Sequence, residues 1–247
     1  MKERREYKYL LDENGAARVR DAIAGICVPD EHAGHYLIDT LYLDTLGHHL
    51  YRATIENEPI RHKLRIRTYP GAASPVFLEV KRRIDDVIIK SRAALRGDWV
   101  RFLDTGDLDI VEPAEREAAE QFLAYYQTNR GGAVVPAVLV RYEREAYTST
   151  LDDYARVTFD RKIQFQPHSE LSLVADERAW TPIDDPIAMR STGQSSACVL
   201  ELKFGPRAPT WLWQLVQRLE LARLAFSKYT RSIDSMLYRP LARFAEG

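Results

Sequence analysis

Residues 61–69 read RHKLRIRTY. Side chains at positions i and i+2 of a β-strand share a face, so Arg65 and Arg67 point to one side and Leu64 and Ile66 to the other. The alternation of β-favouring residues predicts a strand with one cationic face and one apolar face. Such a strand can pack its apolar face on a core while its charged face meets water or a ligand.

The same arrangement recurs along the chain. The same-face pairs are Glu6 with Lys8, Glu79 with Lys81, Lys90 with Arg92, and Glu201 with Lys203. In a single strand, a charged face in water above an apolar core is the usual explanation. Repeated Arg and Lys at neighbouring positions repel one another unless an anion compensates their charge. The repetition therefore favours an antiparallel β-barrel that binds a polyanion such as a triphosphate in its lumen.

The pattern of the whole chain indicates an α+β protein with dominant β-structure. Strands are predicted at residues 4–11, 37–44, 61–69, 76–82, 87–92, 137–147, 156–165 and 197–204. Helices are predicted from a cap at Asp12 to about Ile26, over Pro113–Asn129, from a cap at Thr210, and after Ser227. In the third helix, Trp211, Trp213 and Leu215 are expected in the core. The length of 247 residues suits one domain.

Composition narrows the function classes. The 35 Lys and Arg against 36 Asp and Glu leave a net charge of -1, which gives no overall attraction to nucleic acid or an anionic membrane. Aromatic residues beside basic ones, such as Tyr69, Phe77, Tyr142 and Tyr229, keep a single-strand nucleic-acid barrel as an alternative, but the broad basic surface typical of that class is missing. No nucleic-acid partner is therefore expected.

Two cysteines, no signal-peptide pattern and no apolar run of the roughly 20 residues needed to span a bilayer indicate a cytoplasmic protein. A membrane-protein partner and the oligomeric state have no signature in the sequence.

The residue types suit phosphate chemistry. The planar fork of Arg can bind phosphate oxygens bidentately, and Lys supplies a compact charge. The carboxylates Glu6, Glu79 and Glu201 suggest a divalent cation, Mn²⁺ or Mg²⁺, that bridges to phosphate oxygens; alternatively they neutralise neighbouring Lys and Arg. Since the sequence has neither a Walker-type glycine loop nor a dinucleotide glycine fingerprint, side chains would have to hold the phosphates.

An ordered series of short motifs extends over nearly the whole chain. It comprises Lys8, LRIR at 64–67, LEVK at 78–81, IIKSR at 88–92, RYERE at 141–145, RVTFD at 156–160, LELK at 200–203 and FSKY at 226–229. This series resembles the VTC domain, the polyphosphate polymerase domain of vacuolar transporter chaperone proteins. That domain lies within the triphosphate tunnel metalloenzyme, or CYTH-like, superfamily.

The resemblance implies a single triphosphate tunnel domain over residues 1–247, an eight-stranded antiparallel β-barrel with flanking helices. Basic residues would hold ATP, another triphosphate or a growing polyphosphate, and Mn²⁺ or Mg²⁺ would assist phosphoryl transfer. By motif match, the phosphate ligands and catalytic residues would be Lys8, Arg65, Arg67, Lys81, Lys90, Arg144, Arg156 and Lys228, with Lys203 as a further ligand. The metal ligands would be Glu201, Glu6 and Glu79.

Three points qualify this correspondence. Arg4 stands where some relatives have the first carboxylate of a paired-Glu motif, and Ala225 stands where the eukaryotic polymerases have Lys. Arg141 and Arg144 would face opposite sides of a regular strand, and Arg144 is the expected ligand.

Three activities remain open: transfer of the terminal phosphoryl group of ATP to polyphosphate, hydrolysis of an inorganic or nucleoside triphosphate, and binding of polyphosphate or nucleotide without catalysis.

Overall fold

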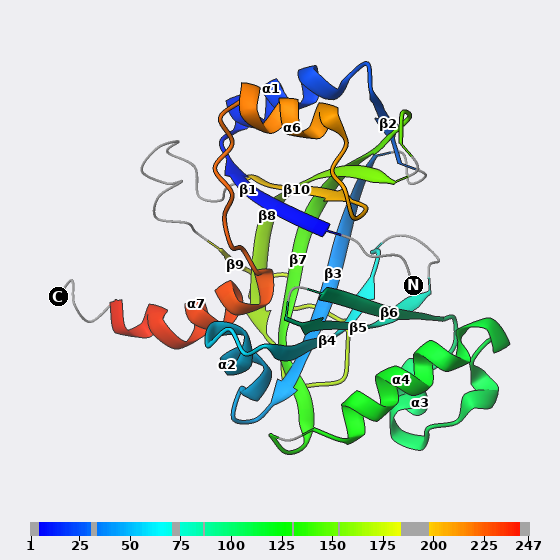
Figure 1. Cartoon of the computed structure of the whole chain (residues 1–247). Helices are drawn as coiled ribbons and strands as arrows, with labels where there is room; N and C mark the ends of the chain where they lie inside the picture. The colour runs from blue at the N-terminus through cyan, green and yellow to red at the C-terminus, as the bar shows by residue number, and fades with distance from the viewer. Residues whose placement is uncertain are drawn as a thin grey trace. The chain divides into compact units, whose positions relative to one another are not determined.

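The computed structural model describes residues 5–30, 34–70, 75–85, 87–129, 131–152, 154–183 and 198–242. The protein is of the mixed α+β class, with a large antiparallel sheet and six α-helices in these ranges (Figure 1). The chain divides into two compact units, each built from three segments. Unit 1 contains Met1–Leu37, Tyr142–Gln164 and Pro182–Ser227, and unit 2 contains Ile38–Arg141, Phe165–Thr181 and Lys228–Gly247.

Unit 1 is a helix-covered group of antiparallel strands. Strand β10 (Cys198–Phe204) pairs on one side with β1 (Arg5–Leu11) and on the other with β8 (Ala155–Pro167). Strand β2 (Cys27–Pro29) pairs with the end of β7 (Val134–Ser149). Helices α1 (Glu13–Ile23) and α6 (Thr210–Arg218) contribute Val19, Ile23, Leu212 and Leu215 to a core shared with Leu200 and Leu202 of β10.

The two helices of unit 1 begin differently. The side chain of Asp12 accepts a hydrogen bond from Gly15 N at 2.6 Å, which confirms the predicted cap of α1. Helix α6 begins after Pro209 with no side-chain cap, so the predicted cap at Thr210 is wrong. Trp213 is 47% exposed and not in the core, because the buried stripe of this helix falls at Leu212 and Leu215.

Unit 2 contains a four-stranded meander. Strand β3 (His35–Thr45) is followed by β4 (Ile60–Thr68), β5 (Val76–Ile84) and β6 (Val87–Leu95), each antiparallel to the one before. The other elements of the unit are α2 (His49–Ile55), α3 (Trp99–Thr105), the 3₁₀ turns η1 (Leu108–Ile110) and η2 (Pro113–Glu115), α4 (Arg116–Gln127) and α7 (Lys228–Ala242). A short strand, β9 (Thr181–Pro182), pairs with β8.

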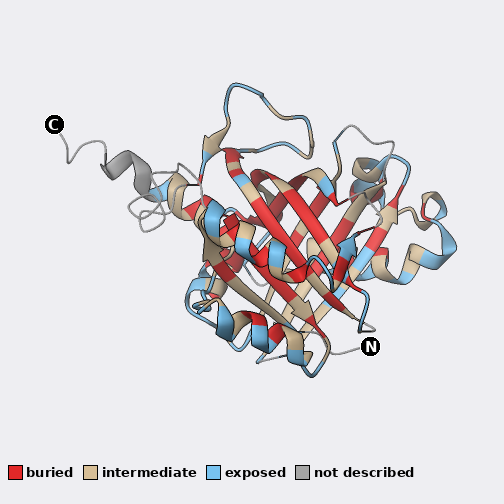
Figure 2. Ribbon diagram, turned by 90° about the horizontal axis from the view of Figure 1, so that it is seen from above, coloured by how far each residue is buried: buried red, intermediate tan, exposed pale blue. Residues whose placement is uncertain are grey.

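Alternation separates the two faces of this meander. Leu64 and Ile66 of β4 and Leu78 and Val80 of β5 are buried in one core with Phe122 of α4. Buried residues follow the strands, whereas the exposed ones gather on helices and loops (Figure 2). The opposite strand face is therefore left to the charged residues of β4, β5 and β6.

The strand path is β1-β10-β8-β7-β3-β4-β5-β6, with β2 beside β7 and β9 beside β8. All eight predicted strands are present, with ends shifted by a few residues. Within the described residues this path has two ends, so the sheet is not the closed eight-stranded barrel that the sequence predicted. The outer edge of β1 is taken by another segment: Tyr9 forms a β-bridge with Arg223, and Leu224 N donates to Lys8 O at 2.8 Å. None of the described helices is long and apolar enough to cross a bilayer.

Candidate functional site: two charged clusters

The first cluster lies in unit 2 around Glu79 of β5, whose side chain is completely buried. Its Oε2 lies 2.5 Å from Arg65 Nε and 3.8 Å from Arg67 Nη2. Its Oε1 lies 2.6 Å from Lys90 Nζ and 3.6 Å from Arg92 Nε. We call these five residues the Glu79 cluster. Four cations face a single carboxylate, so the cluster carries an excess of positive charge that suits a polyanion.

Strand register brings these side chains together. Glu79 lies opposite Arg65 on β4 and opposite Arg92 on β6. Tyr42 of β3 lies opposite Arg65, and its hydroxyl accepts a hydrogen bond from Arg65 Nη1 at 3.4 Å. Cross-strand partners on one face of a sheet are close neighbours, so a single row links four strands.

The cluster shifts the pKa values of its members. Burial alone would raise the pKa of Glu79, but Arg65, Arg67 and Lys90 outweigh it and hold the pKa well below its ordinary value. Burial, together with the charges of Arg65 and Arg67, lowers the pKa of Lys90 to about 7 in spite of Glu79. Glu79 is therefore ionised at neutral pH, whereas Lys90 changes its protonation state near neutral pH.

Two further predicted phosphate ligands belong to unit 2. Lys81 lies on the same face of β5 as Glu79 and directly opposite Lys90. Lys228 is the first residue of α7 and is buried. Burial would raise the pKa of Tyr42, but the charges of Arg65 and Lys228 lower it, which indicates that Lys228 lies within electrostatic reach of this phenol.

The second cluster lies in unit 1 around Glu201 of β10. Its Oε2 lies 2.6 Å from Lys203 Nζ and 3.1 Å from Arg144 Nη2, and its Oε1 lies 3.3 Å from Lys8 Nζ. Two more carboxylates join it: Asp160 binds Arg144 through two bonds of 2.6 and 2.7 Å, and Glu6 lies 3.2 Å from Lys8. We call these six residues the Glu201 cluster. Its three cations are balanced by three carboxylates, unlike those of the Glu79 cluster.

Burial and charge compete inside the Glu201 cluster as well. Burial would lower the pKa of Lys8, but Glu201 and Glu6 raise it above its ordinary value. Burial likewise disfavours the charge of Arg144, yet Asp160 keeps its pKa well above the ordinary value. For Lys203 burial prevails over Glu201, and the pKa is lowered.

Arg156 adjoins this cluster on β8. It lies opposite Lys203 in the register and pairs with Asp30, while its Nη2 is 3.2 Å from the hydroxyl of Tyr36. Its side chain is 34% exposed, so a ligand could reach it.

The carboxylates differ in how well they fit a metal ion. Glu6 and Glu201 share a cation already, since Lys8 Nζ lies within 3.3 Å of an oxygen of each. Two carboxylates completed by water and phosphate oxygens are a common binding set for Mg²⁺. No described group of three or more His, Cys, Asp or Glu could hold an ion unaided. Glu79 is enclosed by cations, which favours the alternative interpretation that it neutralises them.

The structure therefore distributes the predicted site residues over two groups. Unit 1 brings together Glu6, Lys8, Arg144, Arg156, Glu201 and Lys203, and unit 2 holds Arg65, Arg67, Glu79, Lys81, Lys90 and Lys228. Arg4 lies outside the described residues. Arg141 binds Asp39 through two bonds of 2.7 and 2.8 Å and also Glu177, so its guanidinium is engaged away from the Glu201 cluster.

Sequence reasoning missed Tyr42 and Asp160 as members of the clusters. Asp160 ends the RVTFD motif, so the motif itself contained the signal. Tyr42 has no such signal, because only the register places it beside Arg65.

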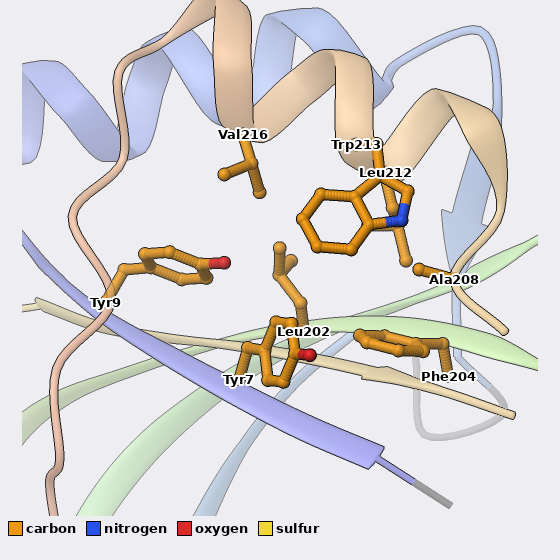
Figure 3. A pocket seen from close by; sticks show the side chains of 8 residues that line it. All are labelled: Tyr7, Tyr9, Leu202, Phe204, Ala208, Leu212, Trp213 and Val216. Atoms are coloured by element: carbon orange, nitrogen blue, oxygen red, sulfur yellow. The ribbon is translucent and has the colours of Figure 1, made fainter. Parts of the chain in front are cut away.

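Unit 1 also contains an apolar pocket, formed by β1, β10 and α6 (Figure 3). Tyr7 packs edge-on against Phe204 and Trp213, with ring centroids 5.1 and 6.3 Å apart. Leu202 and Phe204 line the pocket, and they alternate along β10 with Glu201 and Lys203. The pocket thus lies on the strand face opposite the Glu201 cluster, and we assign it to the packing of α6.

Comparison of the sequence with models of known protein families identifies the family of this chain. A sequence model of the VTC domain matches residues 3–237. The chain belongs to the VTC-domain family. No curated protein sequence was found to match this VTC-domain chain.

Three solved structures align with this chain at low sequence identity, and the first of them shares its fold. An adenylate cyclase candidate from Bacillus halodurans aligns with a TM-score of 0.51 and 10% identity, over 92% of this chain and 94% of that one. The PH1819 protein from Pyrococcus horikoshii OT3 has a TM-score of 0.49 and 12% identity, over 93% of this chain and 97% of that one. A Mimivirus capping enzyme triphosphatase has a TM-score of 0.35 and 10% identity, over 87% and 88%.

Proposed function

We propose that this VTC-domain protein transfers the terminal phosphoryl group of ATP to a polyphosphate chain in a reaction that requires Mn²⁺ or Mg²⁺. The observation that carries the proposal is the Glu79 cluster, where four cations surround one carboxylate on a single sheet face. Family membership agrees with it. An excess of positive charge costs folding free energy unless an anion compensates it, and phosphate chains are the anions that Arg and Lys bind best.

In unit 2, Arg65 and Arg67 would bind phosphate oxygens through their planar forks, and Lys81, Lys90 and Lys228 would add point charges. Phosphoryl transfer proceeds mainly by positioning and by neutralising charge on the phosphoryl oxygens. Cations that are held in place before the substrate arrives supply both effects.

In unit 1, the proposed phosphate ligands Lys8, Arg144, Arg156 and Lys203 are already paired with carboxylates. Glu6 and Glu201 would hold the divalent ion, which would neutralise negative charge on phosphate oxygens when bound. A divalent cation there would also offset two of the three negative charges in the Glu201 cluster. The cluster would then carry net positive charge, so its affinity for phosphate would depend on the metal.

The reaction is balanced without a further reagent. The bond between the γ-phosphorus of ATP and the β–γ bridging oxygen breaks, and ADP leaves with the electron pair. A terminal oxygen of polyphosphate forms the new bond to the transferred phosphorus. If water takes the place of that oxygen as the acceptor, the same residues would catalyse hydrolysis of a triphosphate. If no phosphoryl group is transferred, they would form a site that binds polyphosphate or nucleotide without catalysis.

The test is ³¹P NMR of the purified protein with ATP and Mn²⁺ over time. Internal polyphosphate resonances together with ADP would support the polymerase. Orthophosphate without chain resonances would show that the protein is a triphosphatase and not a polymerase. An unchanged spectrum together with tripolyphosphate binding would show that the protein binds phosphate chains without catalysis.

Two variants sharpen this experiment. Glu201→Gln is expected to abolish turnover. Glu143→Gln is the matched control, because Glu143 pairs with the exposed Lys162 at 2.8 Å and does not belong to the Glu201 cluster. Equal turnover in the two variants would contradict a metal role for Glu201.

A further inference from the structure

Tyr42 of β3 brings a hydroxyl group to the edge of the Glu79 cluster. It lies directly opposite Arg65 in the register, and it alternates along β3 with Leu41 and Leu43, which are buried in the apolar core on the other face. Tyr42 is itself only 5% exposed. Buried hydroxyl groups normally have hydrogen-bond partners, so the surroundings of this one are informative about its role.

The oxygen of this hydroxyl has a partner, but its proton has none. Arg65 Nη1 donates to the phenol oxygen at 3.4 Å, which is long for a hydrogen bond. In the part of the chain that the structure describes, no acceptor lies within hydrogen-bond distance of the phenol proton. A buried donor without an acceptor destabilises a folded protein, so a role in folding does not explain this hydroxyl.

The groups that act most strongly on the phenol are cations. Burial would raise the pKa of Tyr42, but the charges of Arg65, Lys228 and Arg67 outweigh burial and lower that pKa. Guanidinium and ammonium groups carry donors and no acceptor, so these neighbours cannot take the phenol proton. An anion that the cations attract could accept it.

The ring of Tyr42 is held in place by α7. It stacks on the ring of Tyr229, with ring centroids 5.0 Å apart and an angle of 24° between the planes. The hydroxyl of Tyr229 donates to Asp44, and backbone N–H groups of β3 and α2 hold this carboxylate in turn. The phenol is therefore oriented before a ligand arrives, which reduces the entropy lost on binding.

We propose that Tyr42 is a further substrate-binding residue, whose hydroxyl donates a hydrogen bond to a phosphate oxygen beside Arg65. The proposal rests on the proposed binding of phosphate at the Glu79 cluster, and it adds an uncharged donor from β3. A hydroxyl can donate and accept at the same time, so the bond from Arg65 to the phenol oxygen can persist. The new bond ends on an ionised oxygen, which makes it about twice as strong as a bond between neutral groups.

Tyr42→Phe removes the hydroxyl and keeps the stacked ring. Tripolyphosphate should bind to this variant about tenfold more weakly, the size of one lost charge-assisted hydrogen bond, in isothermal titration calorimetry without ATP. The melting temperature of the variant without ligand should equal or exceed that of the parent protein, because the lost hydroxyl leaves no buried donor without an acceptor. A hydroxyl with a structural role would lower it.

Tyr51→Phe is the matched control. Tyr51 is also buried and belongs to the same unit, and its hydroxyl donates to Asp234 at 2.5 Å. Its removal should lower the melting temperature and leave tripolyphosphate binding unchanged. The two Tyr→Phe variants should therefore differ in opposite directions, one in ligand binding and the other in stability.

A double-mutant cycle with Arg65→Gln separates direct contact from an effect transmitted by Arg65. Because Arg65 donates to the phenol oxygen, loss of the hydroxyl also removes a group that orients Arg65. Direct contact with phosphate predicts that Tyr42→Phe weakens tripolyphosphate binding further when Arg65 is already replaced by Gln. An effect transmitted by Arg65 predicts no further change in that protein.

Three results would overturn the proposal. Tripolyphosphate binding that Arg65→Gln weakens and Tyr42→Phe leaves unchanged would exclude Tyr42 from the site. No further loss in the double variant would make Tyr42 a residue that orients Arg65. A melting temperature of Tyr42→Phe as low as that of Tyr51→Phe would assign the hydroxyl to folding. Binding that Arg65→Gln does not affect would instead refute the underlying phosphate site at the Glu79 cluster.

Discussion

Glu79 is a buried carboxylate that holds mutually repelling cations in place. Its ionised form is favoured by Arg65, Arg67 and Lys90, and its pKa is depressed accordingly. The associated stabilisation is present above the ordinary carboxyl pKa and is lost as pH falls toward the depressed value. Glu79 therefore stabilises the empty protein, and a bound anion would take over part of its role.

Glu79→Gln tests this dual role. The variant should lose about 3 kcal/mol of unfolding free energy, because removing one member of a buried ion-pair network leaves the other charges uncompensated. Tripolyphosphate should restore part of the loss and raise the melting temperature more than in the parent protein. Urea unfolding with and without tripolyphosphate measures both effects, with the partly buried Glu143→Gln as the control outside the Glu79 cluster. An equal shift in melting temperature for the variant and the parent protein would contradict the model of charge replacement.

Lys90 gives the site a pH dependence. The pKa of Lys90 is lowered to about 7, so in the protein without ligand its side chain is largely charged below pH 7 and largely neutral above it. A bound phosphate favours the charged form, so above pH 7 binding must take up a proton and affinity should fall as pH rises. In Lys90→Arg the charge persists through this range, and that decline should disappear.

The measurement is tripolyphosphate binding by calorimetry from pH 6 to pH 9. Ionisation of the ligand affects both proteins equally, so the difference between the two curves isolates Lys90. Curves that coincide would assign the pH dependence to another group.

At the scale of elements, a single carboxylate organises the start of α2. Asp44 at the end of β3 accepts hydrogen bonds from the backbone N–H groups of Thr45, Leu50 and Tyr51 at 2.7, 2.8 and 2.9 Å. It also accepts one from the hydroxyl of Tyr229 on α7. The residue at the N-cap, His48, has a left-handed backbone conformation and no side-chain cap bond. Asp44 replaces that cap from outside the helix.

Asp44→Ala should therefore destabilise unit 2 by about 3 kcal/mol, since several buried donors lose their acceptor. Asp44→Asn should cost less, because the amide oxygen can still accept, and Tyr229→Phe should cost about 1 kcal/mol. Guanidinium unfolding provides the free energies, and the order of the three variants is the diagnostic result. A larger loss in Tyr229→Phe than in Asp44→Ala would show that the docking of α7, not the start of α2, is the dominant contribution.

At the scale of the molecule, the net charge of -1 conceals clusters of opposite character. The Glu79 cluster has excess positive charge, whereas the cations of the Glu201 cluster are matched by carboxylates. The proposed attraction of phosphate would thus be local to the Glu79 cluster. Its binding should weaken with salt in proportion to the few cations engaged and not to the total number of basic residues.

The Glu79 cluster has excess positive charge, whereas the charges of the Glu201 cluster are balanced. This difference predicts that a chelator of divalent ions stops phosphoryl transfer but not the binding of tripolyphosphate. EDTA should abolish phosphoryl transfer from ATP, because in the proposed reaction an ion held by Glu6 and Glu201 would neutralise phosphate oxygens. Tripolyphosphate binding to the Glu79 cluster should persist, since side chains alone supply its charges. Calorimetry and ³¹P NMR on one EDTA-treated sample test both statements. Loss of tripolyphosphate binding with the metal would show that the Glu79 cluster does not act unaided.

The sequence by itself determined the strands and the character of their faces. In RHKLRIRTY the two-residue period separates Arg65 and Arg67 from Leu64 and Ile66, and the structure buries Leu64 and Ile66 completely. The cap at Asp12 and the series of VTC motifs were likewise readable, because helix caps and short motifs depend on neighbouring residues. Local periodicity is a property of a few adjacent residues, and it needs no knowledge of the fold.

Only the tertiary structure decided the partners of those charges and the form of the sheet. The sequence could not show that Arg144 binds Asp160, or that Tyr42 joins Arg65, because strand register is set by pairing between distant segments. It did not predict α2, whose seven residues are too few for a stable isolated helix and whose backbone is held by Asp44. The predicted barrel failed for the same reason. Closure depends on which segment pairs with the edge of β1, and residues 223–224 occupy that edge through backbone hydrogen bonding that no side-chain pattern records.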